Sequence, residues 1–279
     1  MTPANIKLNR RGAAGDVLCC SAIIRAAKKK YPKTGLFFQT DHPGALANNP
    51  HLHNPAQKSI QHNNAVTWDL SGFTKEHFGW HLIDVLASNY FKQGEVEHKL
   101  EMFPAQADYA WAGERMPQTP AITIAPGPGK YLCRNWSQER WNAIIEWLLP
   151  NYPVVIVGTK DRHSYRLHPQ VFDLRGETNE MQLAAVVDLS RLVVSLDNFV
   201  LHVAGAMRTK RIGLFGVTRP ELILCDFPYI ACCSDPEHLL TGARHKVQSI
   251  VEIKCDVRNN PMNDITVDAV IDVLQMCGL

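Results

Sequence analysis

The residues best suited to chemistry lie in three short polar segments, each of which follows a predicted buried strand. Ligands of open α/β sheets bind at the carboxyl ends of the strands, so a functional site is expected among these segments. The first segment, RRGAAGD, ends with Asp16 at the start of a predicted helix. Its small residues permit a tight bend of the backbone. This position predicts that Asp16 is either a helix N-cap or a general base.

The second segment, APGPGKYLCRNWS, connects the strand AITIA to a helix that opens at Ser137. It carries two glycines, Gly127 and Gly129, and two cations, Lys130 and Arg134. Exposed N–H groups, the helix dipole and the cations all favour phosphate oxygens. The segment therefore predicts an anion site, and the alternative is a solvated basic loop.

The third segment ends a buried strand and begins another predicted helix, and it contains Asp197, Asn198 and His202. Asp197 and His202 lie about one helical turn apart at the carboxyl edge of the sheet. This arrangement favours a role for His202 in a site as much as it favours a buried structural histidine.

Short apolar runs alternate with helical patterns along the chain, which is typical of an α/β protein with parallel sheets. The expected strands are 6–8, 35–39, 65–70, 121–125, 153–158, 171–174, 191–196 and 211–216. The expected helices are 17–31, 77–91, 137–149, 160–168, 180–189, 198–207 and 266–276.

A composition break with two prolines separates the two halves of the chain at residues 105–120. Because 279 residues suit two modest domains, we predict an N-terminal domain at 1–115 and a C-terminal domain at 116–279. The last helix has one apolar face and is expected to pack onto a domain, with packing back on the N-terminal domain as one option.

The composition excludes several classes of protein. With 46% hydrophobic and 20% charged residues, the chain is neither disordered nor a coiled coil. The formal charge of +2 predicts no stable nucleic-acid partner and at most peripheral membrane contact, and the run Lys28-Lys29-Lys30 is expected to be a solvated helix face. The start of the chain does not resemble a signal peptide, and no apolar window of about 18 residues occurs, so a cytoplasmic location is predicted.

The eight cysteines are expected to be reduced thiols in a cytoplasmic protein. A zinc site is the alternative, drawn from Cys225, Cys232, Cys233, Cys255, His238 and His245. No C-x-x-C pair supports a zinc site, and no Asp-x-Asp motif offers the paired carboxylates of a metal-dependent sugar transferase. We therefore predict no metal site and no cofactor.

Four stretches of the chain resemble glycosyltransferase family 9. They are the opening RRGAAGDVLCCSAIIRAAKKKYP, the loop APGPGKYLCRNWSQERW, the long stretch DLRGETNEMQLAAVVDLSRLVVSLDNFVLHVAGAMRTKRIGLFGVTRP and the closing CDVRNNPMNDITVDAVIDVL. The third stretch is the most specific. This family holds the lipopolysaccharide heptosyltransferases.

The resemblance implies the GT-B fold, in which two Rossmann-like domains face each other across a cleft. It also implies an enzyme that moves a heptose-like or hexose sugar from a nucleotide-diphosphate sugar to a hydroxyl of a glycan or glycolipid, as in lipopolysaccharide biosynthesis. The N-terminal domain would bind the acceptor and the C-terminal domain the donor. Transfer would invert the anomeric centre without a metal ion.

Carried over residue by residue, the resemblance implies Asp16 as the catalytic carboxylate and Arg134 as the phosphate-binding cation. The other expected donor-binding residues are Gly127, Gly129, Lys130, Asp197, Asn198 and His202. The expected acceptor-binding residues are Arg10, Arg11 and Gly15. The chain departs from the family pattern in having Asn198-Phe199 after the donor-loop Asp, where a Ser or Thr followed by Gly is usual, and in a short N-terminal half.

Two alternatives remain open at this point. A compact enzyme of this type could act on a modified nucleobase or a small metabolite in place of a lipopolysaccharide core. A non-catalytic nucleotide-binding protein of the same fold is the other alternative, because fold does not by itself imply function. The position of the Asp16 side chain discriminates between an enzyme and a binding protein.

Overall fold

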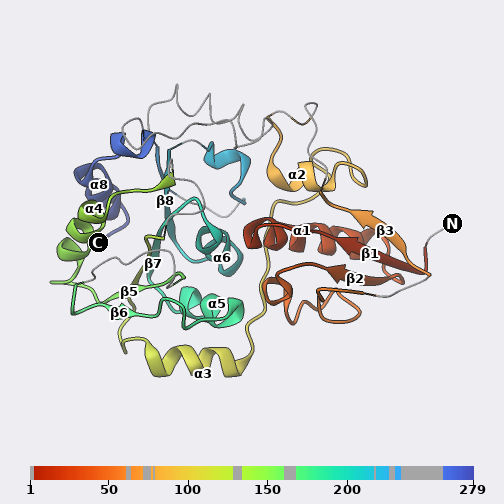
Figure 1. The fold of residues 1–279 in the computed structure, drawn as a ribbon, viewed down its shortest axis with the longest axis horizontal. Helices are drawn as coiled ribbons and strands as arrows, with labels where there is room; N and C mark the ends of the chain where they lie inside the picture. The colour runs from red at the N-terminus through yellow and green to blue at the C-terminus, as the bar shows by residue number, and fades with distance from the viewer. Residues whose placement is uncertain are drawn as a thin grey trace.

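The structure of the chain is a computed structural model, which describes residues 3–60, 64–71, 77, 79–127, 134–159, 168–216, 218–225, 230–233 and 260–279. It is an α/β protein with two parallel sheets. Figure 1 shows the sheets in two lobes, with α1 of one lobe facing α6 of the other. The expectation of two Rossmann-like domains in an α/β fold is confirmed.

The first sheet has three parallel strands in the order β2-β1-β3. Its strands are β1 (Asn5–Asn9), β2 (Gly35–Gln39) and β3 (Val66–Asp69). The helical segments of this half are α1 (Ala14–Lys30), the 3-10 turn η1 (Pro43–Leu46), α2 (Leu82–Ala87) and α3 (Gln106–Arg115). The alternation along β1 buries Ile6 and Leu8, which anchor this strand in the core.

Helix α1 is buried along most of its length because it packs both against the rest of the first lobe and against α6 of the second lobe. Ten of its residues are buried, and Val17, Leu18, Ile23 and Ile24 are completely inaccessible to solvent. Three lysines occupy its last turn, where positive charge is favourable to the helix dipole. The carboxyl end of β1 therefore leads directly into a helix that contacts both halves of the protein.

The second sheet has six parallel strands in the order β6-β5-β4-β7-β8-β9. They are β4 (Ile122–Ala125), β5 (Val154–Ile156), β6 (Phe172–Asp173), β7 (Leu192–Leu196), β8 (Arg211–Phe215) and β9 (Ile230–Cys233). All residues of β4, β7 and β8 are buried, as expected for the central strands of a parallel sheet covered on both faces. The order places β4 beside β7, so the loops after these two strands are neighbours.

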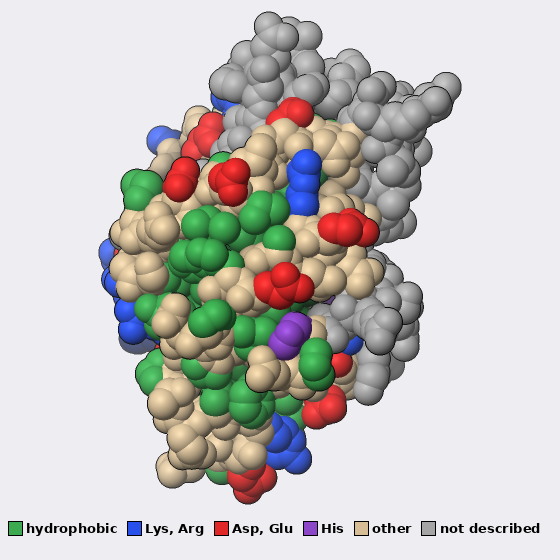
Figure 2. Space-filling view, turned by 90° about the vertical axis from the view of Figure 1, so that its left-hand side faces the viewer, with side chains coloured by type: hydrophobic (Ala, Val, Ile, Leu, Met, Phe, Trp, Pro, Cys, Tyr) green, Lys and Arg blue, Asp and Glu red, His purple; other side chains and the backbone are tan. Residues whose placement is uncertain are grey.

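The helical segments of the second half are α4 (Gln138–Leu148), α5 (Glu180–Asp188), α6 (Phe199–Met207), α8 (Val267–Met276) and the 3-10 turns η5 (Pro220–Leu222) and η8 (Pro261–Asp264). Helix α8 packs against α4, and its Val270 and Leu274 join the core of the second sheet. The option that the last helix returns to the N-terminal domain is therefore wrong. Figure 2 shows this side of the molecule, where hydrophobic side chains gather between charged ones.

The structure corrects several expected elements. Helix α1 begins at Ala14, three residues before the expected start, and α2 is shorter than expected. Helix α3 occupies part of the segment that the composition marked as a break. Strand β9 was not expected, and the helix expected at 160–168 falls almost entirely outside the described residues.

The two halves contact each other through α3 and α5 as well as through α1 and α6. Tyr109 of α3 donates a hydrogen bond to Asp188 of α5 at 2.8 Å. Helix α3 therefore packs on the second half although it precedes residue 116, where the C-terminal domain is predicted to begin. That boundary stays a prediction. In the described part of the chain, no helix is long and apolar enough to cross a membrane.

Candidate active site

The loop between β1 and α1 places a carboxylate at the carboxyl edge of the first sheet. Asp16 lies in the first turn of α1, and its Oδ2 accepts a hydrogen bond from Nη2 of Arg10 at 2.5 Å. The N-cap of α1 is Ala13, which has no side-chain capping bond. The interpretation of Asp16 as the N-cap is therefore wrong, because the chain enters the helix earlier than the sequence pattern indicated. The carboxylate faces the guanidinium of a buried arginine.

The loops after β4 and β7 meet through an ion pair. Nη2 of Arg134 lies 3.2 Å from Oδ2 of Asp197, and Nη1 donates to the backbone carbonyl of Asp197 at 3.4 Å. Arg134 also donates to the hydroxyl of Thr218, which follows β8. Both partners of the ion pair are largely buried, with side-chain exposures of 16% and 8%. A buried ion pair is costly to break on one side only, so this pair holds the two loops together.

Asn198 is the N-cap of α6 and connects the same two loops. Its Oδ1 accepts hydrogen bonds from the N–H of Val200 and the hydroxyl of Ser195, both at 2.9 Å. Its Nδ2 donates to the carbonyl of Gly127 at 3.5 Å. Asparagine is among the preferred N-cap residues, so the departure from the family pattern at this position retains the capping function.

Helix α6 brings the loop of the first sheet next to the loops of the second. His202, which is 6% exposed, lies on α6 with its Nδ1 at 3.8 Å from the thiol of Cys19 on α1. The same ring packs against the backbone of Gly15, where an added Cβ would lie 2.9 Å from Cδ2 of His202. His202 therefore connects the second half to the first half at Gly15, the residue that precedes Asp16.

This close approach predicts that Gly15→Ala lowers the free energy of unfolding by about 1–2 kcal/mol, because an overpacked contact forces the imidazole or α1 to move. Gly113→Ala is the matched control, since Gly113 lies in α3 with no atom near the position of an added Cβ. That control is expected to stabilise the protein by about 0.5–1 kcal/mol. Urea unfolding of both variants measures the difference, and equal effects would show that His202 does not restrict Gly15.

A second histidine forms a polar contact between the two halves. Nδ1 of His81 accepts the N–H of Ile83 at 3.1 Å and so caps α2, while its Nε2 donates to the carbonyl of Leu224 at 2.8 Å. The ring stacks on His98, with 3.8 Å between centroids, and His98 bonds to Asp84. Burial and, to a lesser extent, the neighbouring His98 lower the pKa of His81 to about 4. His81 is therefore neutral at physiological pH.

The lowered pKa of His81 predicts a pH-dependent loss of stability. Below its ordinary pKa of 6.5 the unfolded chain binds a proton that the folded protein excludes, so acidification favours unfolding until the pH reaches about 4. Between pH 6.5 and 5.5 this residue is expected to cost about 1 kcal/mol. His81→Asn keeps a capping side chain and should remove that part of the slope. Unchanged pH dependence in urea unfolding would contradict the assignment.

The predicted site residues thus fall into two neighbouring groups. One group, around α1, contains Arg10, Gly15, Asp16 and His202. The other, at the ends of β4 and β7, contains Gly127, Arg134, Asp197 and Asn198. Arg11 is exposed at the tip of its loop, and Gly129 and Lys130 lie outside the described residues.

Three residues of this region were missed by sequence reasoning. Thr218 is hydrogen-bonded to Arg134, and Ser195 to Asn198. Cys19 contacts His202. The sequence indicated Thr218, because this residue lies in the segment LFGVT of the long stretch that resembles family 9. Ser195 and Cys19 lie within buried apolar runs, where the sequence does not distinguish them from core residues.

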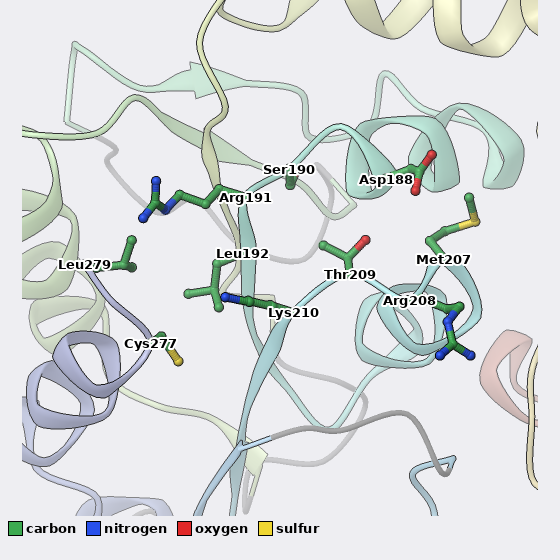
Figure 3. A pocket seen from close by; sticks show the side chains of 10 residues that line it. All are labelled: Asp188, Ser190, Arg191, Leu192, Met207, Arg208, Thr209, Lys210, Cys277 and Leu279. Carbon is green, nitrogen blue, oxygen red and sulfur yellow. The ribbon is translucent and has the colours of Figure 1, made fainter.

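A cavity of about 320 Å³ opens at the opposite edge of the second sheet (Figure 3). It is lined by Arg191, Arg208 and Lys210 at the amino ends of β7 and β8, and by the ends of three helices. Helices α5, α6 and α8 all end there, so their terminal carbonyl groups attract cations. The hydrogen bond from Arg191 to the carbonyl of Gly278 is an example. The helix ends therefore explain why cations gather around this cavity. The cavity lies away from the candidate site.

Within the described residues no group of three His, Cys, Asp or Glu side chains is arranged to hold a metal ion. Among the described residues, Cys19, Cys20, Cys225 and Cys277 form no disulfide bond. Burial raises the pKa of Cys20, which keeps this thiol protonated. Of the zinc alternative, His238, His245 and Cys255 lie outside the described residues, as do the side chains of Cys232 and Cys233.

The two Rossmann-like domains, each built on a parallel sheet, have the GT-B architecture of glycosyltransferases. The chain belongs to glycosyltransferase family 9 (heptosyltransferase), whose family model matches residues 16–233. The resemblance found in the sequence is therefore confirmed, and so is the expectation of an enzyme. No curated protein sequence matches the chain.

Several solved structures have the same fold at low sequence identity. A family 9 glycosyltransferase from Veillonella parvula is 12% identical with a TM-score of 0.77, over 98% of this chain and 97% of that one. The E. coli ADP-heptose lipopolysaccharide heptosyltransferase II is 14% identical with a TM-score of 0.75, over 98% of both chains. TibC, an iron-containing dodecameric glycosyltransferase from enterotoxigenic E. coli, is 12% identical with a TM-score of 0.72, over 99% of this chain and 76% of that one.

Proposed function

We propose that the protein transfers a heptose-like sugar or hexose from a nucleotide-diphosphate sugar to an acceptor hydroxyl, with inversion and without a metal ion. The observation that carries this proposal is the position of Asp16. It lies at the carboxyl edge of the first sheet, beside the contact of Gly15 with His202, and 29% of its side chain is exposed. A carboxylate there is accessible to an acceptor and adjacent to the helix that begins at the donor loop.

In the proposed reaction, Asp16 takes the proton of the acceptor hydroxyl as the oxygen attacks the anomeric carbon. The bond between that carbon and the diphosphate breaks, and the nucleotide diphosphate leaves with the electron pair. Arg134 and the amino ends of α4 and α6 would stabilise the charge on the departing oxygens. Each of these groups lies at the carboxyl edge of the second sheet.

The donor proposed first is ADP-heptose, and the acceptor is a glycan or glycolipid of the lipopolysaccharide type. This choice rests on the similarity to heptosyltransferase II, named for ADP-heptose and lipopolysaccharide, and to TibC, whose structure was also determined with ADP-D-β-D-heptose. Arg11 is an exposed cation in the loop that leads to α1 and Asp16, and we propose it as an acceptor contact. We propose a cytoplasmic location, where such nucleotide sugars are made.

The departure from the family pattern at Asn198-Phe199 would be the evidence for the alternative, a non-catalytic binding protein. Because Asn198 caps α6 and bonds to the loop after β4, the altered dipeptide is compatible with an ordered donor loop. The test is ADP release from ADP-D-β-D-heptose, with lipopolysaccharide from a strain that makes no core heptose as the acceptor. Turnover supports the proposal. Thermal stabilisation by ADP without release of ADP under any donor and acceptor tested would favour the binding protein.

Metal independence gives a separate prediction. With excess EDTA, the rate of ADP release is expected to stay within about twofold of the untreated rate, because the proposed stabilisation of the diphosphate relies on Arg134 and helix dipoles. Since TibC contains iron, the metal content of the purified protein should be measured in the same preparation. Loss of activity with EDTA that is restored by a divalent ion would overturn this part of the proposal.

A further inference from the structure

The side chain of Arg10 forms the only ion pair to Asp16 among the described residues. Its Nη2 donates to Oδ2 of Asp16 at 2.5 Å, and Oδ1 has no hydrogen bond or ion pair within the described part of the chain. Charge-assisted bonds of this kind are short and about twice as strong as bonds between neutral groups. One carboxylate oxygen is thus held by the protein, and the other is left for a substrate.

Arg10 is itself firmly placed. It continues β1, where its backbone N–H donates to the carbonyl of Gln39 at 3.0 Å, and the residue is 8% exposed. The loop that follows turns at Gly12, whose φ of 117° is readily available only to glycine. This turn brings Gly12 within van der Waals distance of the guanidinium, since an added Cβ would lie 3.9 Å from Nη2. The loop between β1 and α1 therefore turns close to the guanidinium of Arg10.

We propose that Arg10 is a positioning residue for Asp16, which orients the carboxylate so that Oδ1 receives the proton of the acceptor hydroxyl. This inference rests on the proposed function of Asp16 as the general base. Arg10 was expected to bind the acceptor directly, whereas in this proposal it acts through Asp16. The reason is that a guanidinium that is buried and bonded to Asp16 has little surface for a second ligand. Without this bond, the side chain of Asp16 would sample several rotamers, of which few direct an oxygen to the acceptor.

The variant that tests the inference is Arg10→Lys, which keeps the positive charge but loses the planar guanidinium. We expect kcat for ADP release from ADP-D-β-D-heptose, with heptose-free lipopolysaccharide as acceptor, to fall about 10-fold or more. The affinity for ADP should be unchanged, since the ion pair of Arg10 is with Asp16 and not with any described residue of the donor loops. Arg25→Lys is the matched control: Arg25 lies on α1, the helix that carries Asp16, in an ion pair with Glu101 at 3.0 Å, and its replacement should leave kcat unchanged.

The same substitution is then made in the Asp16→Asn background. If Arg10 acts through the carboxylate, Arg10→Lys should change the residual rate of that variant by less than about twofold, because coupled residues are not additive. An equal loss in both backgrounds would overturn the inference and assign Arg10 a separate role. If Asp16→Asn is fully active, the proposed base is wrong; if it is inactive while Arg10→Lys has normal kcat, only the positioning role is wrong.

Chemical rescue covers the case in which Arg10→Lys folds poorly. The Arg10→Ala variant leaves space for a guanidinium ion, and millimolar guanidinium should raise kcat at least several-fold over an equal concentration of sodium chloride. The same addition should leave the Arg25→Ala variant unaffected. Equal rates in the two salts would contradict a role for the guanidinium group.

Discussion

Asp16→Asn is expected to reduce turnover by at least about 100-fold while donor binding and folding are retained. Proton transfer to a positioned base typically contributes 10²–10⁴-fold to a rate, and asparagine is not basic enough to replace the carboxylate. The amide can still accept a hydrogen bond from Arg10, which limits the structural change. ADP release measures turnover, and calorimetric titration with ADP measures binding.

The stability of this variant is part of the test. Replacing the carboxylate leaves the buried charge of Arg10 uncompensated, so a loss of about 1–2 kcal/mol is expected, which corresponds to a melting temperature within about 5 °C of the wild type. Asp16→Glu is the conservative control, because it keeps the charge and displaces it by one methylene. A folded Asp16→Asn protein with normal turnover would assign Asp16 a structural role and require another base.

Arg134→Ala is expected to weaken the binding of ADP by about 1.5–3 kcal/mol, or roughly 10- to 150-fold in Kd. Two effects act together. The substitution removes the proposed charged donor to the phosphates, and it removes the ion pair between Arg134 and the carboxylate of Asp197, 8% exposed, near an anionic ligand. Calorimetric titration at constant salt concentration measures the change.

Two controls separate these effects. Combining Arg134→Ala with Asp197→Asn removes the negative charge of that carboxylate as well, so ADP affinity should recover in part. Arg191→Ala removes the same charge from the opposite edge of the second sheet, where Arg191 bonds to Gly278, and should leave affinity unchanged. Equal losses in Arg134→Ala and Arg191→Ala would mean that general electrostatic attraction, and not a contact at the donor loops, accounts for the effect.

Much of the second half could be predicted from the sequence. Strands β4, β7 and β8 are short apolar runs between polar or glycine-containing turns, so their local pattern is sufficient. The same pattern located the loops after β4 and β7, because ligands of parallel sheets bind at the carboxyl ends of the strands. Helix α3 was missed because it buries only Ala112 completely and shows little apolar periodicity.

The α/β class, the family and the loops proposed to form the site could be predicted from the sequence alone, since these follow from local apolar patterns and local motifs. Which side chains contact each other depends on the tertiary structure. Arg134 and Asp197 are 63 residues apart, and Cys19 and His202 are 183 apart, so no local pattern relates them. The pairing of Arg10 with Asp16 spans six residues, yet it depends on the turn at Gly12 and on the depth at which β1 is buried. Those are properties of the folded backbone.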